Sequence, residues 1–231
     1  MLRKIPGGSW LSRWMSPVHL TGRLLERAVE DRAHYSQGWL LDVGCGRMPY
    51  RQKFSRVERY IGLDLLTNKT VDVYGSGLAL PFPSGVFDTV LCNEVLEHVR
   101  EPITAVAEAA RVLKPGGILF VTAPQTWGLH AEPHDYYRFT KYGLQFLAEK
   151  NGLELIEVTP TSGMWATLAQ RLADTVVHTY AAKRPYWVIR LLCFFLVPVQ
   201  LTGYGLDQLF GQRGDTLDHV MLARKPDETG S

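Results

Sequence analysis

Cysteine and net charge are both scarce in this sequence. Three of its 231 residues are cysteine, and no two of them stand in a CxxC or CxxxC spacing. This excludes a disulfide scaffold and gives no zinc signature, and isolated cysteines fit a reducing compartment. Lys and Arg total 25 against 23 Asp and Glu, a formal net charge of +2. We therefore expect no nucleic-acid partner, because such partners select a strongly basic surface.

Signals for export and for membrane crossing are also weak. Proline and glycine at 6–8 break the stretch where a signal peptide needs an unbroken apolar run. The longest apolar segment, 186–201, is interrupted by Arg190, Pro198 and Gln200. Sixteen helical residues would rise about 24 Å, less than the roughly 30 Å of a hydrocarbon core. The sequence thus predicts a cytoplasmic protein without a transmembrane helix.

Short apolar runs alternate with amphipathic segments along the chain. Apolar residues at helical spacing predict helices over 20–35 and 102–113 and after Thr140. The apolar runs predict strands at 39–43, 60–64, 71–74, 87–92, 118–121, 153–158 and 219–223. Lys114 to Gly117 are expected to end the second helix before its strand begins. Such alternation predicts an α/β fold with an open, mostly parallel seven-stranded sheet and helices on both faces.

The same patterns divide the chain into four parts. They are a basic N-terminal arm and helix at 1–36, a sheet domain at 37–159, a helical apolar insert at 160–216, and a last strand with tail at 217–231. Segments 1–18 and 186–201 combine apolar residues with tryptophan or tyrosine and basic neighbours. This is typical of peripheral contact with a membrane interface, and the inner face of a membrane would suit it. A lid over the site or a homodimer contact explains the insert equally.

Two polar motifs follow the first two predicted strands. Gly44, Cys45 and Gly46 form a turn, but Pro49 stands where a dinucleotide fingerprint has its third glycine. This disfavours NAD and FAD and leaves a bend suited to a nucleoside without a diphosphate. Asp64 ends the second strand, eighteen residues beyond Gly46, where a carboxylate can accept both hydroxyls of a ribose.

Four segments carry a resemblance to a known family. They are LLDVGCG at 40–46, YIGLDLL at 60–66, LALPFPSGVFDTVLCNEVLEHV at 78–99 and ARVLKPGGILFVTAP at 110–124. In this order they resemble the class I S-adenosylmethionine (SAM) dependent methyltransferases, in particular the UbiE-like, methyltransferase domain 11 type. The resemblance implies a Rossmann-like sheet, SAM as cofactor, and methyl transfer to a hydroxyl, in preference to an amine, of a small-molecule, glycan or lipid-linked acceptor.

The resemblance also implies roles for matching positions. The turn would surround the methionine part of SAM, with Asp42 orienting its amino group, while Asp64 holds the ribose and the loop from Ser76 borders adenine. The full implied set is Asp42, Gly44, Cys45, Gly46, Asp64, Leu65, Ser76, Gly77, Leu78, Asn93, Glu94 and Val95. Most relatives carry aspartate where Ser76 stands. The adenine contact is therefore weaker here unless Asp72 replaces it.

A sugar or aliphatic hydroxyl needs a general base, and four residues are candidates. His98 closes the LEHV phrase, and His130, His134 and Asp135 lie together in HAEPHDYYRFT at 130–140. A packed helix position for His98 and a loop-ordering role for the His134–Asp135 pair remain alternatives. The spacing matches no zinc signature and methyl transfer from SAM requires no metal, so we expect no metal.

Other function classes stay open or are disfavoured on stated grounds. A nonenzymatic scaffold that binds SAM or a nucleoside would share the glycine turn and Asp64, and differs by lacking an open pocket with a base. A nicotinamide oxidoreductase is disfavoured by Pro49. Methylation of nucleic acid is disfavoured because no Asn-Pro-Pro-aromatic phrase follows the fourth strand.

Overall fold

The computed structural model describes residues 19–65, 71–177, 179 and 184–227, and the chain separates into two compact units. Of the described residues, the sheet unit comprises those within 27–125, 129–160 and 218–227. The hairpin unit comprises those within 19–26, 126–128 and 161–217. The predicted insert at 160–216 thus lies almost wholly in the hairpin unit, and segment 1–18 is outside the described residues.

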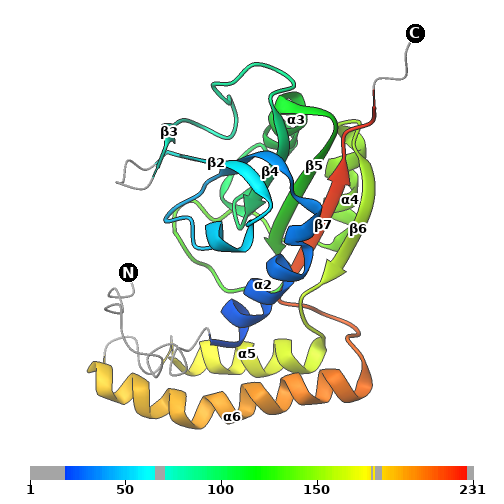
Figure 1. The fold of residues 1–231 in the computed structure, drawn as a ribbon. Helices are drawn as coiled ribbons and strands as arrows, with labels where there is room; N and C mark the ends of the chain where they lie inside the picture. Colours follow the sequence, from blue (N-terminus) through cyan, green and yellow to red (C-terminus); the bar gives the residue numbers. More distant parts are fainter. Residues whose placement is uncertain (1–18, 66–70, 178, 180–183, 228–231) are drawn as a thin grey trace. The chain divides into compact units, whose positions relative to one another are not determined.

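The sheet unit contains a seven-stranded sheet in the order β3-β2-β1-β4-β5-β7-β6 (Figure 1). Its strands are β1 Gly38–Val43, β2 Val57–Asp64, β3 Val73–Tyr74, β4 Phe87–Asn93, β5 Leu113–Pro124, β6 Glu154–Pro160 and β7 Asp218–Arg224. All neighbouring pairs run parallel except those of β7, which is antiparallel to β5 and β6. The predicted mostly parallel Rossmann-like sheet is confirmed.

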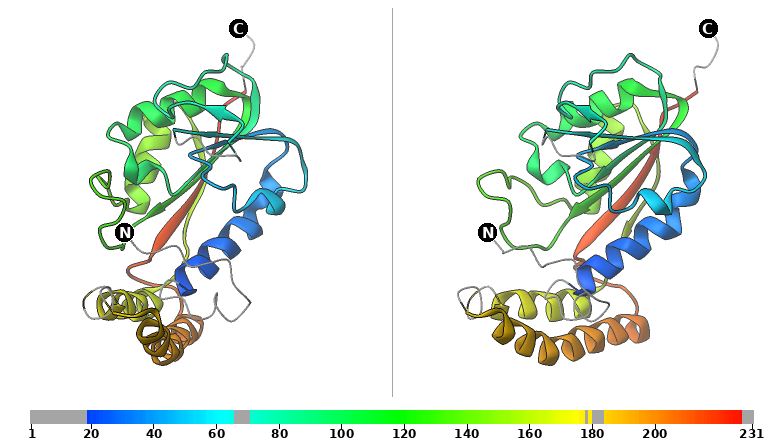
Figure 2. Two further views of the ribbon diagram at one scale, coloured as in Figure 1. Left: turned by 90° about the vertical axis from the view of Figure 1, so that its left-hand side faces the viewer. Right: turned by 60° about the vertical axis from the view of Figure 1, so that its left-hand side comes forward.

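Two hydrophobic cores lie on opposite faces of this sheet because successive strand residues point to opposite sides. Leu40 packs in one core with Ala28 and Val29 of α2 (His19–Arg32). Leu41, the next residue of β1, packs in the other core. That second core includes buried residues of α3 (Pro102–Val112) and α4 (Lys141–Lys150). Helices therefore cover both faces, as Figure 2 shows from two further sides.

Several predicted boundaries differ from the structure, among them those of the third and fifth strands. The third strand was expected at 71–74 but pairs with β2 only at Val73 and Tyr74. Lys114 to Gly117 do not separate α3 from its strand, since β5 already begins at Leu113. Phe87 pairs with Leu113 and Thr89 with Ile118, so the intervening residues form an irregularity inside the strand.

The hairpin unit is built on two helices, α5 (Met164–Val176) and α6 (Tyr186–Phe210). The prediction of a sixteen-residue apolar segment at 186–201 was too short, because α6 has 25 residues and continues through Pro198. At 1.5 Å per residue it rises about 37 Å. Within the described chain, Trp187–Phe210 is the one helix long and apolar enough to cross a membrane by length and composition.

Candidate active site

The glycine turn after β1 lies against the end of β2. Gly44 and Gly46 have φ angles of +69° and +52°, which residues other than glycine rarely adopt. The N–H groups of Gly44 and Cys45 donate to the carbonyl oxygen of Leu63 at 2.8 and 3.1 Å. The N–H of Gly46 donates to Oδ2 of Asp64 at 2.8 Å. The structure therefore brings the predicted turn and the predicted ribose acid into direct contact.

The end of β4 meets the same turn. Glu94 has φ of +53°, and its N–H donates to both the carbonyl oxygen and Oγ1 of Thr122 at 3.1 Å. Thr122 Oγ1 in turn donates to Oδ1 of Asn93 at 3.0 Å. This bend places Val95 against Gly44, where an added Cβ would lie 2.6 Å from Val95 Cγ2. Only glycine fits at position 44 without displacement of Val95.

Asp42, two residues before Gly44, is buried and accepts a hydrogen bond from Tyr60. The Tyr60 hydroxyl donates to Asp42 Oδ2 at 2.6 Å. Burial raises the pKa of the Asp42 carboxyl to about 7, an effect opposed by this hydrogen bond and added to by the charge of Asp64. A cationic group beside Asp42 would stabilise its ionised form. The sequence did not predict that Tyr60 contacts the cofactor site, because a tyrosine inside an apolar strand does not indicate a hydrogen bond to a buried acid.

The loop after β3 reaches the end of β1. Gly77 lies close to Val43, with an added Cβ 3.1 Å from Val43 Cγ1. Ser76 Oγ accepts the N–H of Leu78 at 3.1 Å, so it is engaged in closing its own turn. Asp72 accepts the N–H of Gly62 at 2.8 Å, which ties the loop to β2. Both candidate partners for adenine are thus bonded to backbone.

Two other predicted residues have simple surroundings. Cys45 is buried, and burial raises the pKa of its thiol to about 12, so it is an inert packing residue. Leu65 is exposed at the end of β2.

These observations fit the methionine and ribose parts of SAM. Among the described residues, no atom lies within 4 Å of a Cβ added on Gly46, so they leave space open beside the turn. The backbone bend can accommodate the sulfonium side, Asp42 can receive an ammonium group, and Asp64 stands where the ribose hydroxyls are expected.

A second group lies beyond the end of β4. It consists of Glu97, His98 and His130 and is here called the acid–histidine cluster. Their ligand atoms all lie within 4.8 Å of one another. The rings of His98 and His130 pack edge to face with centroids 4.7 Å apart. His98 lies in the short 3-10 helix η3 (Leu96–His98), and its Nδ1 is 2.6 Å from the carbonyl oxygen of His134. Because a carbonyl oxygen can only accept a hydrogen bond, Nδ1 is the donor, and in the neutral ring Nε2 is then the acceptor.

Glu97 is the member that sequence reasoning missed. Its carboxyl is fully buried, and neither oxygen has a hydrogen-bond partner among the described residues. Burial, reinforced by Glu94, raises the pKa of Glu97 to about 9, so it is protonated near neutral pH. Its Oε1 lies 3.6 Å from His98 Nε2. Three such groups have the composition of a cation site, but they equally suit a neutral acid beside a neutral imidazole.

The other two catalytic candidates are placed differently. Asp135 is held by a bidentate ion pair with Arg138 at 2.7 and 2.8 Å, and it accepts the N–H of His130. The Arg138 hydrogen bonds hold the pKa of Asp135 well below its usual range, so it is a weak proton acceptor. His134 contacts His98 only through its backbone oxygen, while its ring nitrogen meets the Tyr136 hydroxyl at 3.0 Å.

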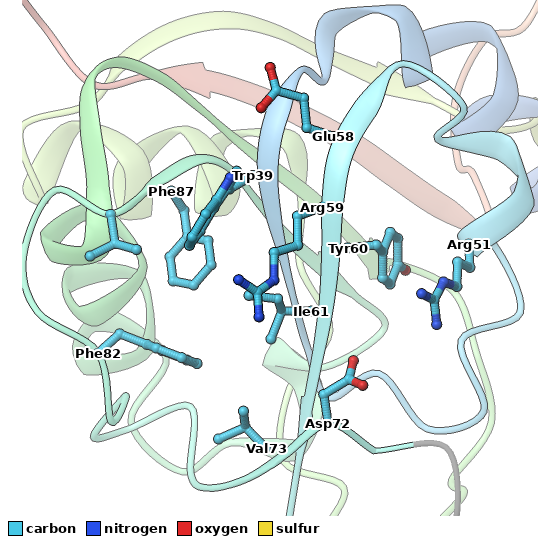
Figure 3. A pocket seen from close by; sticks show the side chains of 11 residues that line it. Trp39, Arg51, Glu58, Arg59, Tyr60, Ile61, Asp72, Val73, Phe82 and Phe87 are labelled. Carbon is cyan, nitrogen blue, oxygen red and sulfur yellow. The ribbon is translucent and has the colours of Figure 1, made fainter.

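A pocket of about 590 Å³ lies along the outer strands (Figure 3). In Figure 3, Trp39 and Arg59 lie on one side of β2, and Tyr60 and Arg51 on the other. The lining residues are Trp39, Arg51, Glu58, Arg59, Tyr60, Ile61, Asp72, Val73, Phe82, Val86 and Phe87. Asp72, the alternative adenine partner, and Tyr60, the hydrogen-bond partner of Asp42, are among them, whereas the glycine turn and the four catalytic candidates are not.

Comparisons with known proteins agree with this geometry. The profile of the methyltransferase domain family matches residues 41–121. The ubiquinone biosynthesis O-methyltransferase of Thiobacillus denitrificans is 31% identical over 202 residues, covering 73% of this chain and 87% of that protein. A methyltransferase-like protein of Bacillus halodurans C-125 superposes with a TM-score of 0.55 at 18% identity, covering 87% of this chain and 98% of that one.

Phosphoethanolamine N-methyltransferase 2 of Haemonchus contortus, whose structure is a complex with S-adenosyl-L-methionine, gives a TM-score of 0.57 at 17% identity. It covers 96% of this chain and 61% of that one. The sequence likeness, the family profile and the sheet order point the same way. The chain therefore belongs to the class I SAM-dependent methyltransferases, and it is an enzyme that uses SAM as its cofactor.

Proposed function

We propose that the enzyme methylates a hydroxyl group of a small-molecule or lipid-linked acceptor and that His98 accepts the hydroxyl proton. The observation that carries this is the orientation of His98, whose Nδ1 is occupied by the His134 carbonyl oxygen at 2.6 Å. The imidazole then keeps Nε2 as its basic atom. The name of the relative, an O-methyltransferase of ubiquinone biosynthesis, supports oxygen as the methylated atom.

Electrostatics around His98 favour the neutral, basic form of the ring. Burial lowers the pKa of His98 below 6.5, an effect added to by His130 and opposed by its bond to the His134 carbonyl and by Asp135. A protonated Glu97 adds no negative charge that would hold a proton on Nε2. His98 is therefore ready to accept a proton near neutral pH, which is what a base for hydroxyl methylation needs.

SAM supplies the activated methyl group, so the protein has to align the acceptor oxygen and remove its proton. Asp64 and the Gly44–Gly46 turn bind and orient the nucleoside, and Val95 packs against that turn. His98 lies three residues beyond Val95 on η3. The proposed base and Val95, which packs against the turn, thus come from one continuous segment after β4.

The test compares two histidine substitutions. His98→Asn is expected to lower kcat by about 10²- to 10⁴-fold, with the Kd for SAM changed by less than about threefold. His134→Asn is the matched control, because His134 meets His98 through a backbone oxygen that the change retains. Activity of His98→Asn equal to wild type would refute the role of His98.

The acceptor is identified by methyl labelling. Enzyme and SAM with a carbon-13 methyl group are incubated with cell extract, which is then separated into lipid, glycan, small-molecule and protein fractions. We expect label in the lipid or small-molecule fraction, in a methyl ether recognised by its carbon-13 chemical shift. An N-methyl product, or label in protein alone, would contradict the proposal. A cytoplasmic location, with access to the inner face of a membrane, remains our prediction for this enzyme.

A further inference from the structure

The hairpin unit has polar side chains on its inside. Gln170 and Asp174 of α5 and Gln200 of α6 are buried. Nε2 of Gln200 donates to Oε1 of Gln170 at 3.0 Å, and Nε2 of Gln170 donates to Oδ1 of Asp174 at 3.0 Å. A chain of hydrogen bonds thus joins the two helices beside an apolar cluster that includes Ala173, Val177 and Leu196.

A second polar link joins the ends of the same helices. Asp207 of α6 is buried, and its carboxylate accepts the N–H groups of Gly163, Trp165 and Ala166 at 2.7, 3.1 and 3.2 Å. These are the first N–H groups of α5, which has glycine at its N-cap and no side-chain cap of its own. The negative carboxylate therefore caps α5 from the partner helix.

Small residues let the helices approach closely. An added Cβ on Gly203 would lie 2.6 Å from the carbonyl oxygen of Trp165 and 2.8 Å from Cβ of Ala169. Ala166 and Ala173 are buried. Small residues and interhelical hydrogen bonds between side chains are how helices associate in lipid, where apolar contact gives no driving force.

The outer surfaces also carry large apolar residues. Leu168 and Leu172, one helical turn apart, are exposed on α5, and Trp187, Leu191, Phe194 and Phe195 are exposed on α6. Only 18% of the most apolar stretch of α6 is buried, whereas a core helix would be mostly buried. Leaving this surface in water is unfavourable, so it has an apolar partner.

The charged residues of the hairpin unit indicate which kind of partner covers its apolar surface. Residues 161–217 contain five Lys and Arg against three Asp, and two of these acids, Asp174 and Asp207, are buried inside the hairpin. Arg184 and Arg213, which flank α6, are exposed. Apolar side chains bordered by positive charge match the interface of an anionic bilayer.

We propose that the α5–α6 hairpin inserts its outer apolar surface into one leaflet of an anionic membrane. It does not cross the bilayer, because its two ends join strands that pair with each other, Pro160 of β6 with His219 of β7. The 13 residues of α5 rise about 20 Å, too little to return through a core of roughly 30 Å. The enzyme is thereby held where lipid-linked molecules lie.

The test uses the full chain and vesicles of equal parts phosphatidylcholine and phosphatidylglycerol. We expect the wild type to sediment with these vesicles, and less with phosphatidylcholine alone. The double variant Phe194→Glu with Phe195→Glu, at positions 64% and 63% exposed, should lower vesicle affinity about tenfold or more. The control, Tyr142→Glu with Phe146→Glu, changes two exposed aromatic residues of α4 and should bind as the wild type.

Three results would overturn the proposal. They are wild-type protein that stays in the supernatant, a Phe194/Phe195 variant that binds like the wild type, and equal binding to both kinds of vesicle. If the wild type does not bind vesicles and is a dimer, whereas the Phe194/Phe195 variant is a monomer, the surface is a contact between two copies of the chain. SAM titration of each variant checks that it is folded, and the outcome is independent of which acceptor the enzyme methylates.

Discussion

Asp42 offers the sharpest test of the electrostatics of the cofactor site. Its buried carboxyl has a pKa raised from 3.8 to about 7. In the unfolded chain the group ionises near its ordinary value, so between those two pH values the folded state binds more protons and stability falls as pH rises. The cost to folding is about 1.5 kcal/mol at pH 5 and reaches about 4 kcal/mol at pH 8.

Asp42→Asn removes this cost while keeping an oxygen that accepts the Tyr60 hydroxyl. We therefore expect the variant without SAM to be more stable than the wild type, by about 4 kcal/mol at pH 8. For a chain of this length that corresponds to a Tm rise of roughly 8–16 °C, against roughly 3–6 °C at pH 5. Because an ammonium group would favour ionised Asp42, the same variant should bind SAM more weakly. Differential scanning calorimetry and isothermal titration measure the two effects.

Two controls isolate the cause. Asp31→Asn makes the same chemical change on α2 at a side chain that is 60% exposed, and should change Tm little at either pH. Tyr60→Phe removes the 2.6 Å hydrogen bond to the carboxylate and should destabilise the protein most at high pH. A Tm shift for Asp42→Asn that is the same at pH 5 and pH 8, or a loss of stability, would refute the reasoning.

Three further predictions concern the turn and the base. Gly44→Ala should weaken SAM binding about tenfold or more, measured by titration, because its Cβ would press on Val95; Gly85→Ala, with the same φ of +69° but open space, should not. The acid limb of the pH profile of kcat/KM should have an apparent pKa below 6.5 as His98 gains a proton, and an acid limb with an apparent pKa above 6.5 would contradict this. Dialysis against EDTA should leave turnover unchanged; loss of turnover that a divalent cation restores would make the acid–histidine cluster a metal site.

The sheet could be predicted because its signals are local. Buried parallel strands are short apolar runs, and the first two are bounded by Gly44, which follows β1, and by Asp64, which ends β2. The length of α6 could not be predicted in the same way. Gln200 and Asp207 look like interruptions of an apolar segment, yet both are buried and hydrogen-bonded to residues at α5. Only the partner helix reveals that they continue the helix.

The catalytic side of the site depends on contacts between distant segments, which sequence spacing does not encode. His130, His134 and Asp135 are neighbours in the chain, and each was a candidate for the base. The turn at 131–134, closed by the His134 N–H donating to the carbonyl of Ala131, leaves Nδ1 of His130 at 3.4 Å from Oδ2 of Asp135 and directs the His134 ring to Tyr136.

Asp135 then pairs with Arg138, while His130 packs on His98 from η3. The N–H groups of Tyr136 and Tyr137 donate to the carbonyl of Glu97 at 2.8 and 3.3 Å, which fixes this loop to η3. The atom that orients the proposed base is a backbone oxygen of His134, and any residue at that position supplies one. The orientation of the proposed base therefore depends on the path of the loop rather than on the His134 side chain, and His134→Asn separates the two.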